Sequence, residues 1–162
     1  MKKLFTIIFF LIICLPVNAE VLEAGISIED VPQALFGLWR VSAKLDDTNS
    51  YSTFKPQSID IWNLSRIGDR IRLENPNSGA KAEISVKTVE GNLIIFQKSA
   101  NYSTNKVLTD TVHLRLEKDT FSGINTLKLE TFSLVDNHLM KTETAQYVIK
   151  GEKLSGDNII PE

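Results

Sequence analysis

From Leu38 onward, apolar and polar residues alternate along the chain, with the period of two that is typical of half-buried β-strands. The first run sets apolar residues against polar ones, with Trp39, Val41, Ala43 and Leu45 between Arg40, Ser42 and Lys44. Similar alternation returns over residues 80–89 and 107–117, and another long strand is expected over 139–150. In the run 107–117, the apolar face also carries Asp110. These segments predict a chain built almost entirely of strands.

Short turn signals separate the predicted strands, at residues 68–69, 75–79, 90–92 and 136–137. Many short strands with such spacing favour antiparallel hairpins that curl around one apolar centre. We therefore predict an all-β fold, an antiparallel up-and-down β-barrel of about eight strands with a short N-terminal helix. A two-sheet sandwich would show the same pattern and stays open at this point.

The helix is predicted just before the first strand. Asp30 suits the N-cap, Pro32 suits the first turn, and Gly37 fits the position just past the end. The longest gap between strands is the polar segment 46–56, which we interpret as a lid or an entrance. A second polar segment, 99–106, is predicted to be another loop.

Two aromatic residues do not fit the inward face assigned from the alternation. In the strand predicted over residues 58–65, Ile59 and Ile61 are taken as inward, which places Trp62 on the opposite face. Phe132 falls on the outward side in the same way. Such side chains would pack under the helix or the N-terminal arm, or would form an exposed patch for a partner.

Residues 1–19 have the features of a secretory signal peptide: Lys2 and Lys3, then an apolar stretch over 4–15, then Ala19 at the expected cleavage position. The apolar stretch is too short for a membrane anchor, which needs about 20 residues. Cys14 would suit a lipoprotein signal, but Ile13 stands where such signals carry a small residue. The predicted organisation is a signal peptide at 1–19, an arm and helix at 20–35, a barrel domain at 36–155, and a loose tail at 156–162.

Cleavage after Ala19 would remove the single cysteine, and with it any disulfide or thiolate ligand. It would also remove two basic residues and no acidic one, making the charge more negative than the −2 of the whole chain. An acidic balance argues against nucleic acid as a partner. The expected location is the periplasm or the extracellular space, without a stable membrane anchor.

Motifs that carry catalysis or bind metals are missing from the sequence. His113 and His138 lack the spacing of a zinc site, and no nucleophile elbow or phosphate-binding loop occurs. We therefore predict a non-enzymatic protein with no metal and no cofactor. The candidates for ligand binding are Asp110, a carboxylate on an apolar face, and Tyr147, one of the aromatic residues that would line a cavity or fill the core.

Gly37-Leu38-Trp39, placed after a short helix at the start of the first strand, resembles the opening element of lipocalins and related calycin-like barrels. The resemblance implies structural roles for Gly37 and Trp39, with the Trp ring packed across the closed end of the barrel. It also implies a basic residue of the last strand over that ring, for which Lys150 and Lys153 are the candidates. An Asp-Tyr turn, the second feature of that family, has no counterpart here.

Three functions are compatible with such a barrel. The first is an exported lipocalin-like protein that binds a small, partly apolar molecule, which would enter at the end away from Trp39 past the segment 46–56. The second is a cell-envelope scaffold or protein-interaction module with a filled core and an exposed aromatic patch. The third, a small hydrolase or isomerase built around Asp110, is the least favoured.

Overall fold

A computed structural model describes residues 26–156 and 158–160. The predicted signal peptide, with Cys14 and the proposed cleavage position, lies outside the described residues. Among the described residues, none forms a helix long and apolar enough to cross a membrane.

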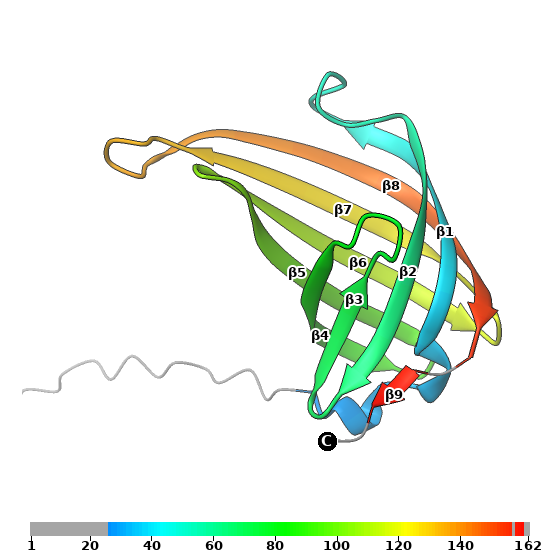
Figure 1. The fold of residues 1–162 in the computed structure, drawn as a ribbon. Coiled ribbons are helices and arrows are strands. Elements are labelled where there is room, and N and C mark those ends of the chain that lie inside the picture. Colours follow the sequence, from blue (N-terminus) through cyan, green and yellow to red (C-terminus); the bar gives the residue numbers. More distant parts are fainter. Residues whose placement is uncertain (1–25, 157, 161–162) are drawn as a thin grey trace, which may run out of the picture.

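The predicted fold class is confirmed, because eight antiparallel strands close into an up-and-down barrel (Figure 1). The pairing of β1 with both β8 and β2 closes the ring. The eight strands are β1 Gly37–Thr48, β2 Gln57–Ile67, β3 Arg70–Glu74, β4 Lys81–Glu90, β5 Leu93–Ser103, β6 Lys106–Glu117, β7 Thr120–Phe132 and β8 Leu139–Ser155. A closed barrel rather than a sandwich is thus observed, and this fold is compatible with the calycin-like architecture.

The expected N-terminal helix is present only as two 3-10 turns, η1 Ile28–Asp30 and η2 Gln33–Leu35, so the prediction of one continuous helix was wrong. Pro32 explains the break, because a residue before proline is pushed out of the helical region. Val31 accordingly has an extended backbone, with φ −77° and ψ 122°. The first turn is capped by Ser27 rather than Asp30, since the Ser27 hydroxyl accepts from the Glu29 amide at 3.3 Å.

Buried side chains around Trp39 fill the closed end of the barrel. Trp39 is fully buried, and its Nε1 donates to the Leu35 carbonyl oxygen at 2.8 Å, which ties the 3-10 turns to the strand. The Lys153 ammonium lies 5.4 Å from the centre of the Trp39 ring and donates to the Ala34 carbonyl oxygen at 2.9 Å. Of the two lysines proposed to cover this ring, Lys153 does so.

The inward face assigned to β2 was wrong. Trp62 pairs directly with Trp39 across the β1–β2 ladder, so both rings point into the barrel. Its ring stacks on Phe121, with centroids 6.0 Å apart, and meets Phe96 edge-on at 6.4 Å. Ile59, by contrast, is 74% exposed on the outer wall.

Two segments predicted to be irregular belong to strands. Residues 99–103 continue β5 and Lys106 begins β6, so the expected polar loop at 99–106 is a hairpin with a two-residue turn. Its polar side chains contact one another across the ladder, as the Ser99 and Thr109 hydroxyls do at 2.9 Å. In the tail predicted to be loose, β9 Asn158–Ile160 adds to β2 in parallel.

Candidate functional site

The barrel encloses a cavity of about 480 Å³ above the filled closed end. Trp62 lies at the boundary between the two, since it lines the cavity and also stacks on Phe121 below. The lining combines apolar and polar side chains, and includes Val41, Ala43, Phe54, Leu127, Ile149, Ser58, Asp60, Asn125 and Tyr147. The prediction left open a hollow or a solid interior, and the structure has both, at opposite ends.

The strands around the cavity are of unequal length, so its wall is incomplete on one side. β3 pairs with β2 only over residues 63–67 of β2, and β4 pairs with β5 only as far as Gln97. The segments 57–62 of β2 and 98–103 of β5 therefore have a ladder on one side only among the described residues. The wall is lower on the β3–β4 side, and Figure 1 shows this hairpin ending below the longer strands around it.

Tyr147, one of the two candidate ligand-binding residues, lines this cavity. Its side chain points inward from β8, and its hydroxyl donates to the Lys55 carbonyl oxygen at 2.9 Å. Burial raises the pKa of the Tyr147 phenol, so the ring stays neutral at physiological pH. Tyr147 thus joins the cavity wall to the segment that covers the mouth.

Asp110, the other candidate, is buried on the inward face of β6, as its place in the alternating pattern predicted. Its carboxylate accepts a hydrogen bond from the Asn125 amide and forms an ion pair with Lys98 at 3.1 Å. Asn125, not Asp110, lines the cavity. Asp110 therefore acts on the site indirectly, because it holds the Asn125 amide in one orientation beside Tyr147.

The loop between β1 and β2 closes over the mouth and is fastened to β8. Glu143 is buried, and its Oε1 accepts from the hydroxyls of Ser50 at 2.6 Å and Thr53 at 2.7 Å. Lys141 forms an ion pair with the same oxygen at 2.9 Å. Phe54, held in this loop, is buried against the cavity. The segment proposed as a lid does cover the cavity in this structure.

Glu143 was not among the residues singled out from the sequence. The alternation along β8 did contain a signal for it. Glu143 falls on the same face of the strand as Ala145, Tyr147 and Ile149, which are all buried. An acidic residue on an inward face calls for partners. The loop hydroxyls that supply those partners lie about 90 residues earlier in the chain, with separations of 90 and 93 positions.

Acid is expected to release this loop. Hydrogen bonds from Ser50 and Thr53, followed by Lys141, lower the pKa of Glu143 from 4.5 to about 2. A carboxyl with a lowered folded-state pKa stabilises the fold above its unfolded pKa, and this contribution is lost as pH falls toward the folded value. We expect amide exchange at Thr53 and Phe54 to speed up severalfold between pH 5 and pH 2, relative to the intrinsic rate.

The Glu143→Gln variant should show fast exchange in this loop already at neutral pH and little further acid response. Glu117→Gln, which changes an exposed carboxylate at the other end of the barrel, is the matched control and should behave as the unmodified chain does. Equal loop protection in Glu143→Gln and the unmodified protein would show that Glu143 does not fasten the loop.

A larger hollow of about 850 Å³ lies on the β1, β2 and β8 wall. Most of its lining side chains point outward from the barrel, among them Lys44, Lys150 and the exposed Ile59 and Val148. We regard it as a groove in the outer surface, because these side chains lie on the outside of the barrel. The interior cavity, which is lined mainly by inward-facing side chains of β1, β2, β7 and β8, is the better candidate site.

Other chemistry has little support in the described residues. In this part of the chain, no group of three or more His, Cys, Asp or Glu side chains is placed to hold a metal ion. His113 points outward from β6, and His138 contacts Asp136 in the β7–β8 turn at 2.6 Å.

No protein-family model, curated protein or solved structure matches this chain.

Proposed function

We propose that this protein is a non-enzymatic carrier or sensor that binds a small, partly apolar molecule inside the barrel, in the manner of lipocalins. The observation that carries the proposal is the interior cavity of about 480 Å³ under the β1–β2 loop. Its volume lies in the range of small-molecule sites, about 300–1,000 Å³. The Gly37–Trp39 element and the lysine over the Trp39 ring support the lipocalin-like reading.

The lining indicates the chemistry of the ligand. The apolar body would contact Trp62, Val41 and Ile149 in the deeper part, where transfer from water is favourable. A polar group would contact the Asp60 carboxylate, which lies beside Val41 in the β1–β2 ladder, or the Asn125 amide beside Tyr147. A molecule with an apolar body and one neutral or cationic polar group fits this lining.

Native mass spectrometry of the protein purified from its own host tests this proposal directly. We expect a population with a fixed added mass that is lost on denaturation, and extraction would identify the molecule. A chain that carries no added mass and takes up none from a total lipid and metabolite extract would contradict the proposal.

A variant that fills the cavity should abolish binding. Leu127→Trp adds volume to an inward position of β7 that lines the cavity. Affinity for an apolar anilinonaphthalene dye is expected to fall by on the order of tenfold or more, because the ring occupies the space of the ligand. Fluorescence titration measures this. Lys128→Trp, at the next and outward position, is the control and should bind the dye as before, and thermal melts show whether both variants remain folded.

The alternative function is an envelope scaffold or protein-interaction module with a filled core and an exposed aromatic patch. That function called for Trp62 or Phe132 in an exposed patch, whereas Trp62 is inside the barrel and Phe132 is half-buried. Unchanged dye binding in Leu127→Trp would return support to this alternative. For either function, we propose an exported, periplasmic or extracellular protein, on the basis of the signal-peptide pattern in residues 1–19.

A further inference from the structure

The turn between β7 and β8 presents an unusual set of exposed apolar side chains. This tip patch consists of Leu134, Val135, Leu139 and Met140, which are 75%, 96%, 50% and 64% exposed. Tyr51 and Tyr102, two strongly exposed aromatic residues, lie in the β1–β2 loop and the β5–β6 hairpin at the same open end. Six of the nine large exposed apolar or aromatic residues in the described chain therefore lie in or beside the turns of this end of the barrel.

The fold does not need apolar residues at these positions. The turn is held by polar groups, with the Ser133 amide donating to the His138 carbonyl at 2.8 Å and the Asn137 amide donating to the Ser133 carbonyl at 3.1 Å. The Ser133 hydroxyl accepts from the Val135 amide at 3.2 Å. Leu134 and Val135 thus project from an ordered turn into solvent, which indicates a partner outside this chain.

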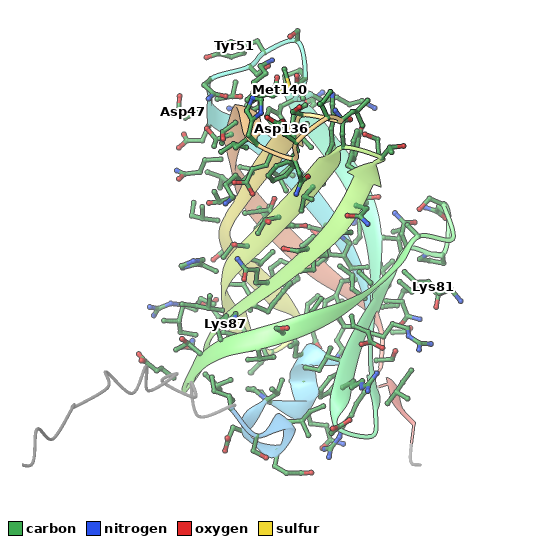
Figure 2. All side chains as sticks on the ribbon, turned by 90° about the vertical axis from the view of Figure 1, so that its left-hand side faces the viewer. Asp47, Tyr51, Lys81, Lys87, Asp136 and Met140 are labelled. Atoms are coloured by element: carbon green, nitrogen blue, oxygen red, sulfur yellow. The ribbon has the colours of Figure 1, made fainter. Side chains whose placement is uncertain are left out.

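The shape of the hairpin favours a lipid bilayer as that partner. β7 and β8 extend beyond the barrel wall, so that the patch stands at the end of a protruding hairpin (Figure 1). Four side chains on a narrow tip offer much less than the roughly 800 Å² per partner of a stable protein dimer. A bilayer accepts a narrow apolar wedge without a matching hollow. Met140 and Asp136 lie toward the same end of the molecule as Tyr51 in Figure 2, although Figure 1 shows the β7–β8 tip well apart from the β1–β2 loop.

Charge and aromatic placement are consistent with that partner. Near the tip, Asp136 contacts His138, and Lys141 is paired with Glu143, so no excess of positive charge is present. Binding should therefore depend on apolar insertion rather than on attraction to anionic headgroups. Tyr51 and Tyr102, with apolar rings and polar hydroxyls, suit the interfacial region around an inserted tip.

We infer that the β7–β8 tip inserts into the surface of a lipid bilayer and docks the open end of the barrel there. Tyr102 lines the interior cavity as well as the exposed rim, so docking brings the cavity mouth close to the membrane. Transfer of a ligand between membrane and cavity would rest on the proposed function, whereas docking itself does not.

A reporter at one residue tests the inference in the full chain. An environment-sensitive dye is attached at Val135→Cys in a Cys14→Ser background, and phosphatidylcholine vesicles are added. We expect a blue shift of the dye, with a similar shift when a fifth of the lipid is phosphatidylglycerol and little effect of salt. The emission of the same dye at Ile59→Cys, an exposed residue on the barrel wall, should not shift. This control separates insertion of the tip from binding of the vesicles through another segment of the chain.

Polar substitutions in the tip give the second arm. With the dye kept at position 135, replacing Leu134 and Leu139 by Ser should raise the lipid concentration for the half-maximal shift by on the order of tenfold or more. Replacing the exposed wall residues Ile59 and Val148 by Ser should leave it unchanged. No shift at position 135, equal shifts at 135 and 59, or a shift that follows protein concentration without vesicles would each overturn the inference. The last result would assign the tip to self-association.

Discussion

Replacing Trp39 by Ala is expected to lower the free energy of unfolding by about 3–5 kcal/mol, the usual cost of truncating a buried Trp. The ring is fully buried and packs on Phe121, with centroids 5.1 Å apart. Its removal opens a cavity at the closed end and leaves the Leu35 carbonyl without the indole donor. The 3-10 turns lose their tie to β1 at the same time. A loss of this size is a large share of the stability of an ordinary domain.

Urea unfolding followed by circular dichroism measures this loss. Tyr51→Ala is the matched control, since it truncates an aromatic residue that is 77% exposed, and it should change stability by no more than about 0.5 kcal/mol. If the two variants unfold at the same urea concentration, the ring of Trp39 does not organise the closed end.

Replacing Gly123 by Ala is expected to cost about 3 kcal/mol or more, although only one methyl group is added. A Cβ at this position would lie 2.1 Å from the His113 carbonyl oxygen and 2.9 Å from the Leu114 Cα. Both atoms belong to the backbone of β6, so relief requires β6 and β7 to move apart. A glycine inside a strand marks either a bulge or a close approach of another backbone. The β6–β7 register continues through it without a shift, so its role is close backbone approach.

Gly156→Ala is the control for that substitution, because a Cβ there meets no atom within 4 Å. It should be neutral or slightly stabilising, since alanine restricts the unfolded chain more than glycine does. Thermal melts of both variants decide the matter. A Gly123→Ala melt within a degree or two of the unmodified protein would mean that the two strands separate at little cost.

Some features of the site were predictable because they depend on local sequence. Alternation in residues 107–117 placed Asp110 on the inward face, where the structure has it. The Gly37–Trp39 element predicted a ring at the closed end with a lysine above it, and Lys153 takes that position. For Asp110, one face of the strand is clearly apolar, so period-two alternation has a single solution. The ring and its lysine followed from the resemblance of Gly37-Leu38-Trp39 to the opening element of lipocalins.

Other features depended on which strands meet. In β2, Ile59 and Ile61 compete with Trp62 and Leu64 for the inward face, and both sets are apolar. Only the pairing of Trp62 with Trp39 decides between them. The polar residues 99–103 have no pattern of their own, and they form a strand because β6 offers a ladder beside them.

The sequence by itself determined the class of fold and the inward place of Asp110, because alternation and turn chemistry act between near neighbours. The tertiary structure alone decided that the other end is hollow and covered. That outcome depends on the short β3–β4 hairpin, on Glu143 reaching Ser50 and Thr53, and on Asp110 orienting Asn125. These contacts join residues far apart in the chain, and only ring closure brings them together.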